Sequence, residues 1–146
     1  NGEVLHIDNV DGSKSVRVSS WIGERRPMHC TAVGKAMLAC KDVEDIEYIC
    51  KTKGMKKYTP NTITTIEGLL HNINLIRQQG YAVDNEELEK DLRCVAAVIR
   101  GYSGEVIGAI SVAAPVVRLG FERIPEVAQK VVDAAKEISY RMGYRA

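Results

Sequence analysis

The chain has 146 residues, of which 45% are hydrophobic and 27% charged, and its 20 basic and 19 acidic side chains leave a formal net charge of +1. This length fits one domain with its own core, and the composition excludes a disordered chain. No apolar run reaches the roughly 20 residues of a membrane helix, the first residues form neither a signal nor a transit peptide, and the charge lacks the basic stripe of a domain that grips DNA by itself.

The start of the chain predicts a pair of strands. Residues 3–10 and 15–22 are rich in Val and Ile, and the turn-forming pair Asp11-Gly12 lies between them. Arg26-Pro27 is expected to end this first sheet. Because the chain begins with Asn1 rather than Met, we expect it to be part of a longer protein.

Three helices are predicted between residues 31 and 80. The apolar segment 31–39 begins with Thr31, a residue type that caps helix N-termini, and Asp42 is expected to cap a second helix. A longer helix follows residues 62–65 and ends at Gly80, where a left-handed cap is favoured. Its apolar residues recur at helical spacing: Ile66, Leu69, Leu70, Ile73 and Ile76.

A short strand and a hairpin are predicted next. Residues 81–84 are expected to form the strand, and the acidic stretch 85–91 is expected to be a solvent-exposed loop or turn of helix. Two apolar runs, 93–100 and 105–114, bracket the glycine-containing loop 101–104. Both runs lack polar alternation, which is typical of central strands covered on both faces.

A final helix is expected to begin near Arg123 or Ile124, since Pro125 fits only a first turn, and to end at Gly143. The order of elements is then two strands, three helices, three strands and a helix. This order predicts an α+β fold in which helices flank a mostly antiparallel sheet.

The hairpin at 93–114 carries an uneven face. If its loop is symmetric, Cys94 lies opposite Ser111, Ala96 opposite Ala109 and Val98 opposite Ile107, and directly opposed residues share a face. One end of that face holds small or weakly polar side chains, namely Cys94, Ala96, Ala109, Ser111 and Ala113. Interiors rarely leave volume unfilled, so either a closely packed helix or a ligand is expected there.

Asp84 favours the ligand. An Asp at this position is most often a turn former or a helix cap. The strand 81–84 would nevertheless deliver its carboxyl to the sheet end that bears Cys94. A carboxyl, a thiol and the Ser111 hydroxyl beside the helix that starts at Thr31 predict a site for a small polar ligand, such as a carboxylate.

Other classes of function stay open on the residues alone. A cysteine-dependent enzyme would need Cys94 activated by one of the three histidines, His6, His29 or His71, and of these His29 is the best placed. His29, Asp84 and Cys94 are also competent metal ligands. Cys30, Cys40, Cys50 and Cys94 form no C-x-x-C pair, which favours a reduced, cytoplasmic protein. A pure dimerisation module is a third possibility, because apolar residues such as Trp21 suit an interface as well as they suit the core.

Three motifs in order resemble the IclR family of bacterial transcriptional regulators. The run His29-Cys30-Thr31-Ala32-Val33-Gly34-Lys35-Ala36-Met37-Leu38-Ala39 resembles the family element H-x-[TS]-A-x-G-K-A-x-L-A. The segments 80–87 and 92–97 resemble its most specific signature, and 104–112 completes it. The resemblance covers essentially the whole chain.

The resemblance implies a GAF/profilin-like effector domain that binds a small organic acid or a related catabolic metabolite, with no catalysis and no cofactor. It implies an N-terminal winged helix-turn-helix domain, absent from this chain, as the part that contacts DNA, and assembly as a homodimer or homotetramer. Effector binding would change the subunit geometry and so the spacing of the DNA-binding parts.

The resemblance also implies the effector contacts. By motif position these are the backbone near Ala32 and Val33, followed by Asp84, Cys94 and Ser111. Family members commonly carry a second serine two residues after the first, where this chain has Ala113, the sixth expected contact. Ala32-Val33 is also bulkier than the Gly-Ala of some members, so we expect a ligand that differs from glyoxylate or pyruvate.

Overall fold

A three-stranded antiparallel sheet in the order β3-β4-β5 separates two layers of helices in the computed structural model, which describes residues 2–14 and 22–146. The strands are β1 (Glu3–Leu5), β2 (Arg25–Pro27), β3 (Ala82–Asn85), β4 (Leu92–Arg100) and β5 (Val106–Pro115). The helices are α1 (Ala32–Leu38), α2 (Val43–Lys53), α3 (Ile66–Gln79) and α4 (Ile124–Arg141), with a short 3-10 turn η1 (Phe121–Arg123). The mixed α+β fold predicted from the sequence is confirmed.

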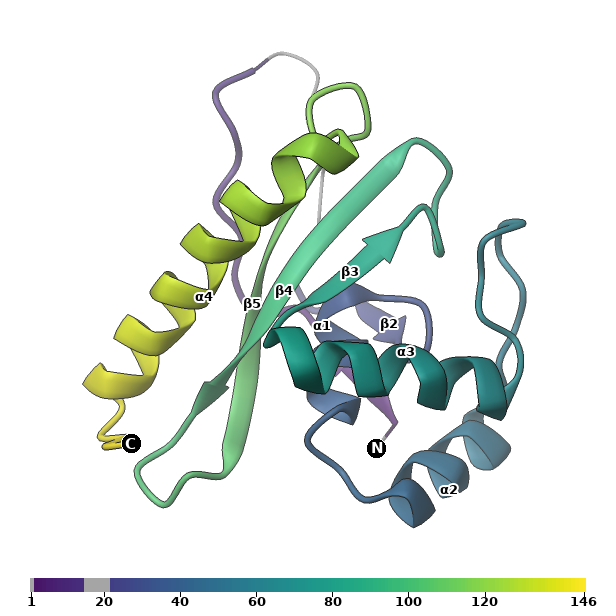
Figure 1. The fold of residues 1–146 in the computed structure, drawn as a ribbon, viewed down its shortest axis with the longest axis horizontal. Helices are drawn as coiled ribbons and strands as arrows, with labels where there is room; N and C mark the ends of the chain where they lie inside the picture. The colour runs from purple at the N-terminus through teal and green to yellow at the C-terminus, as the bar shows by residue number, and fades with distance from the viewer. Residues whose placement is uncertain (1, 15–21) are drawn as a thin grey trace.

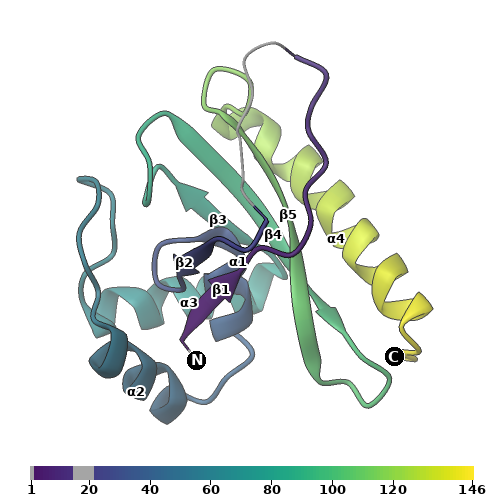
Figure 2. The same cartoon turned by 180° about the vertical axis from the view of Figure 1, so that it is seen from behind.

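The two faces of the sheet bury different cores. Helix α4 covers one face, and α1 lies on the other with α2 and α3 packed beyond it (Figure 1). Side chains alternate along β4, so Val95 and Ala97 pack toward α4 while Cys94, Ala96 and Val98 pack toward α1. Viewed from behind, the small β1–β2 sheet lies beside α1 on this second side (Figure 2).

The helix ends lie where the sequence places them. Thr31 and Thr65 cap α1 and α3 by accepting hydrogen bonds from Gly34 N and Gly68 N, and Gly80 ends α3 in the left-handed conformation. Helix α4 begins at Ile124 with proline in its first turn. Asp42 stands at the N-cap of α2, but its side chain makes no capping hydrogen bond. No helix in the described part of the chain is long and apolar enough to cross a membrane.

The predicted first sheet is wrong in detail. Strand β1 spans three residues instead of 3–10, and its partner is Arg25–Pro27, so the sheet ends at Pro27 as expected but includes Arg26-Pro27. Pro27 pairs with Glu3 at the end of this two-stranded ladder, a position where the missing N–H of proline is tolerated. The second predicted strand, 15–22, lies outside the described residues up to residue 21, and Ile22 lies in a turn.

The predicted register of the β4–β5 hairpin is wrong by two residues. Gly101 N donates to Glu105 O at 2.9 Å and Gly104 has φ of +87°, so the loop has an odd number of residues and a bulge rather than a symmetric turn. A second irregularity falls between Ile99 and Arg100. Cys94 therefore pairs with Ala113, Ala96 with Ser111 and Val98 with Ala109. The shift is two from Cys94 to Ile99, so these pairs keep their predicted faces, whereas Arg100 pairs with Val106, a shift of one that moves Val106 to the other face.

Candidate functional site

The predicted site residues meet where β3 ends and β4 begins. Asp84 pairs with Cys94 across the β3–β4 ladder, and Cys94 pairs with Ala113 across the β4–β5 ladder. Three adjacent strands thus place a carboxyl, a thiol and a methyl group in one row on the face toward α1, where Asp84 is buried, Cys94 half-buried and Ala113 exposed. Ser111 shares this face one pair further along, opposite Ala96. Asp84 lies next to Cys94, as predicted. The Ser111 hydroxyl is not directly opposite the Cys94 thiol, in contrast to the prediction.

Helix α1 covers this row, and its first turn lies close to the backbone of the segment that precedes it. A Cβ on Gly34 would lie 2.4 Å from Met28 Cα, so only glycine fits there. The Thr31 hydroxyl also donates to Pro27 O at 2.6 Å, which ties the helix start to the preceding strand. Ala32 is buried and Val33 is half-buried at this helix start.

The Asp84 carboxyl is only 3% exposed. Its Oδ1 accepts a hydrogen bond from Glu87 N at 2.7 Å. Burial raises the pKa of this carboxyl from 3.8 to about 7, and the charge of Glu87 adds to the rise while the Glu87 N–H and Lys35 oppose it. Near neutral pH the group therefore exists in both protonation states, as a donor and as an acceptor.

Two thiols border this carboxyl. Burial, followed by the charge of Asp84, raises the pKa of the Cys94 thiol and raises that of Cys30 to about 12. Both thiols stay protonated at neutral pH, which disfavours a cysteine nucleophile because the thiolate is the reactive form. Cys30 is fully buried, and the sequence reasoning did not select it for the site.

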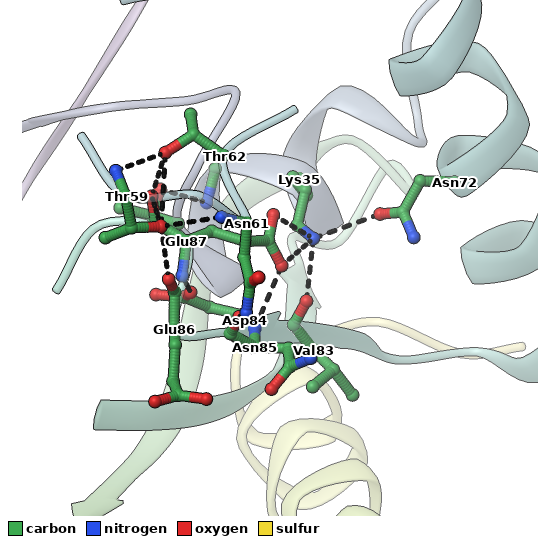
Figure 3. Close-up of polar contacts among 12 residues, drawn as sticks. Lys35, Thr59, Asn61, Thr62, Asn72, Val83, Asp84, Asn85, Glu86 and Glu87 are labelled. Carbon is green, nitrogen blue, oxygen red and sulfur yellow. Dashed lines mark hydrogen bonds and ion pairs between the residues drawn. The ribbon is translucent and has the colours of Figure 1, made fainter. Parts of the chain in front are cut away.

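A buried ion pair, Lys35–Glu87, lies beside the backbone at Asp84 (Figure 3). Lys35 Nζ donates to both carboxylate oxygens of Glu87 at 2.8 and 2.9 Å, to Val83 O at 2.7 Å and to Asn72 Oδ1 at 3.0 Å. Lys35 is fully buried and Glu87 is 5% exposed, so the expectation that 85–91 is wholly exposed to solvent is wrong at Glu87. The one signal in the sequence was a single charge inside an otherwise apolar helix, which demands a partner.

The loop between α2 and α3 holds the same turn from its other side. The hydroxyls of Thr59 and Thr62 donate to Glu86 O and Glu87 O, each at 2.6 Å, and the Asn61 amide donates to Asn85 O at 3.0 Å. The turn that carries Asp84 is thus bonded both to α1 and to this loop.

The histidines lie apart from this arrangement or are engaged elsewhere. The His29 ring is buried, and its Nε2 lies 2.9 Å from Lys56 O. His71 is exposed on α3, and His6 follows β1. Over residues 2–14 and 22–146, no three His, Cys, Asp or Glu side chains are grouped so as to hold a metal. Trp21 lies outside the described residues.

Two hollows open elsewhere on the molecule. One of about 110 Å³ lies between the β2 end and α2, and includes His29 and Tyr58 in its wall. The other, of about 310 Å³, lies between the end of α1 and the β4–β5 hairpin, and includes Cys40 and Arg100. None of the six predicted effector residues lines either hollow.

Comparisons with known proteins agree on one family. The family model described as bacterial transcriptional regulator IclR C-terminal matches residues 1–140. The HTH-type transcriptional regulator KdgR of Escherichia coli (strain K12) is 38% identical over 141 residues, which cover 97% of this chain and 54% of KdgR. The chain thus spans about half the length of such curated relatives.

Solved structures share the fold. The Thermotoga maritima IclR structure matches with a TM-score of 0.91 and 34% identity, over 98% of this chain and 58% of that one. The inducer-binding domain of a double mutant of PobR from Acinetobacter, in complex with 3-hydroxybenzoic acid, matches with a TM-score of 0.77 and 26% identity, over 86% of this chain and 74% of that one.

Proposed function

The chain belongs to the family of IclR C-terminal domains of bacterial transcriptional regulators, and we propose that it is the ligand-sensing part of such a regulator and binds a small organic acid. In this proposal the domain performs no catalysis. DNA is contacted by a separate winged helix-turn-helix domain of the full-length protein, and the effector alters DNA binding through the arrangement of subunits in a dimer or tetramer.

The pairing of Asp84 with Cys94 carries the proposal. A buried carboxyl that is half protonated near neutral pH donates a hydrogen bond to a ligand carboxylate or carbonyl, and accepts one from a ligand hydroxyl. The neutral thiol of Cys94 adds a weak donor, and the Ser111 hydroxyl on the same sheet face adds a second strong one. The proposed contacts are completed by the backbone at Ala32 and Val33 on α1.

The side chain at position 113 affects which acid the proposed site would prefer. Ala113 lies opposite Cys94, so in this proposal a methyl group faces the ligand where the family resemblance implies a second serine hydroxyl. A site with one hydroxyl and more apolar surface favours an acid with a hydrocarbon part beside its carboxylate over the most polar keto acids. The acid named in the PobR complex is aromatic, which supports an organic acid as the ligand class.

The regulatory step follows from differential affinity. An effector that contacts both the sheet residues and α1 favours the arrangement in which those elements lie at one particular distance. Such a ligand shifts the equilibrium between two subunit geometries only by the difference in its affinity for them. The position of the DNA-binding domains in the full-length regulator would follow that shift.

Isothermal titration calorimetry of the chain tests the proposal. Candidate ligands are glyoxylate, pyruvate, a sugar acid and 3-hydroxybenzoate, and the variants are Cys94→Ala and Ser111→Ala. We expect at least one acid to bind and each substitution to weaken its affinity by roughly 5- to 10-fold, the worth of one hydrogen bond.

Ser103→Ala is the matched control, since Ser103 is exposed in the hairpin loop at the far end of β4 and β5. Equal affinity in the wild type and in both site variants would remove the proposed site. A sequence-specific footprint on operator DNA by this chain alone at physiological salt would overturn the assignment of DNA binding to another domain.

A further inference from the structure

We propose that the Lys35–Glu87 ion pair is a positioning element of the effector site, which fixes where the Asp84 carboxyl lies and sets the charge that it presents to the ligand. This inference rests on the proposed function for the meaning of the site. The contacts that support it concern the free protein alone.

The bonds of the pair converge on the residues that flank Asp84. Lys35 Nζ binds the carbonyl of Val83, the residue before it, at 2.7 Å. Glu87 Oε2 accepts from the N–H of Asn85, the residue after it, at 2.9 Å. Asp84 Oδ1 itself accepts from Glu87 N at 2.7 Å. The paired side chains therefore hold the backbone on each side of Asp84, and the backbone N–H of Glu87 holds its carboxyl (Figure 3).

The Lys35–Glu87 pair is not explained by a contribution to the stability of the fold alone. Burying two charges costs several kcal/mol in desolvation, and well-packed apolar residues often serve a fold as well or better. Here Lys35 is fully buried in α1, and a third bond to Asn72 on α3 completes its set of acceptors. The pair connects α1 and α3 to the end of β3, where Asp84 lies. In this proposal, its role there is to fix the orientation of the Asp84 side chain.

The two partners also act on the charge of Asp84 in opposite senses. The carboxyl is faced by Glu87 and Glu89 from the turn, Lys35 from α1, Cys30 from the segment before α1 and Cys94 from β4. Glu87 and Glu89 favour the protonated form of Asp84, and Lys35 favours the ionised form. A change at either member of the pair therefore shifts the pH at which the site becomes negative.

Glu87→Gln removes the negative charge at position 87 and keeps the hydrogen bond from Asn85 N. The amide oxygen of Gln, in the place of Oε2, still accepts from Lys35 and from Asn85 N, whereas the negative charge and the second acceptor of Lys35, Oε1, are gone. Titration of the Asp84 carboxyl carbon by ¹³C NMR in the free protein should show its pKa falling from about 7 by about one pH unit. Lys130→Met, which removes a lysine from an exposed ion pair with Glu126 on α4, should leave the titration unchanged.

Lys35→Met/Glu87→Gln tests the positioning and avoids leaving an unpaired charge buried. Amide hydrogen exchange at residue 87 should become at least tenfold faster than in the wild type, while exchange at Val95 in the centre of β4 stays the same.

Unchanged exchange at residue 87 together with an unchanged Asp84 titration in Glu87→Gln would overturn the inference. Neither measurement uses an effector. A chain that binds none of the tested acids contradicts the proposed function, and these two measurements still decide separately whether the pair positions Asp84.

Discussion

Asp84 lies directly opposite Cys94 on neighbouring strands, and both side chains lie on the face of the sheet that α1 covers. The pairing places a buried acid beside a half-buried thiol, where few water molecules reach either group. Each group is then more stable in its neutral form, and the pKa values of both rise for the same reason. The site therefore presents hydrogen-bond donors at a pH where an exposed Asp would present a charge.

Asp84→Asn should stabilise the protein at high pH. The pKa of Asp84 is about 7 in the folded protein and 3.8 when unperturbed, so the folded state holds a proton that the unfolded state has lost. The wild type consequently loses stability as pH rises from about 4 to about 7, by up to roughly 4 kcal/mol. Asn keeps the acceptor for Glu87 N and carries no charge, so it avoids this loss.

Urea denaturation at pH 5 and pH 8 measures the effect. The free energy of unfolding of the variant, relative to that of the wild type, should rise by roughly 2–4 kcal/mol from pH 5 to pH 8. More of this rise should occur below pH 7 than above it. Asp133→Asn on the exposed side of α4 serves as the control. A difference between variant and wild type that does not change with pH would contradict the pKa shift of Asp84.

The helices and the faces of the strands were predictable because their causes are local. Thr31, Thr65 and Gly80 act within a few residues of themselves, so the sequence alone locates the helix ends. The alternation along β4 likewise assigns Cys94 to the α1 face, and a register error of two residues leaves that assignment intact.

The remaining features depend on distant partners or on loop geometry. The hairpin register depends on a left-handed Gly104 and on a second irregularity beside Arg100, neither of which a symmetric loop contains. Lys35 is buried because Glu87, 52 residues away, neutralises it, and no local pattern pairs the two. Cys30 joins the site only through the close approach of α1 to the sheet.

Ala113→Ser should strengthen binding of small keto acids. The new hydroxyl would stand opposite Cys94, and one added hydrogen bond is worth roughly 1 kcal/mol, or about fivefold in affinity. Calorimetry with pyruvate and glyoxylate measures the change. Ala114→Ser, one residue on and on the α4 face, should give no gain. Equal affinity in Ala113→Ser and the wild type would show that position 113 does not face the ligand.

Gly34→Ala should destabilise the domain strongly. The new Cβ would lie 2.4 Å from Met28 Cα and 2.5 Å from Met28 O, so α1 must move away from the backbone beneath it. Overpacking of this kind costs roughly 1–3 kcal/mol and exceeds the gain of up to about 1 kcal/mol in helix propensity.

Gly68→Ala is the matched control for this substitution, measured by thermal or urea unfolding. Gly68 stands at the same position relative to a threonine cap in α3, but its Cβ would meet only side chains, at 3.0 and 3.4 Å. Gly68→Ala should therefore leave the free energy of unfolding almost unchanged. Similar losses of stability in the two variants would show that the approach of α1 to Met28 is not what requires glycine at position 34.

Lys35→Met should cost more stability alone than together with Glu87→Gln. The single substitution leaves the Glu87 carboxylate buried without its cation, which costs roughly 3–5 kcal/mol, whereas the double variant buries no charge at this place. The free energy of unfolding, measured in urea for both single variants and the double variant, gives the coupling between the two residues. We expect the double variant to recover most of the loss, because the amide that replaces the Glu87 carboxylate still accepts from Asn85 N. Losses that simply add would mean that Lys35 and Glu87 contribute independently, and the connection from α1 to the turn at Asp84 would then depend on the bond of Lys35 to Val83 O.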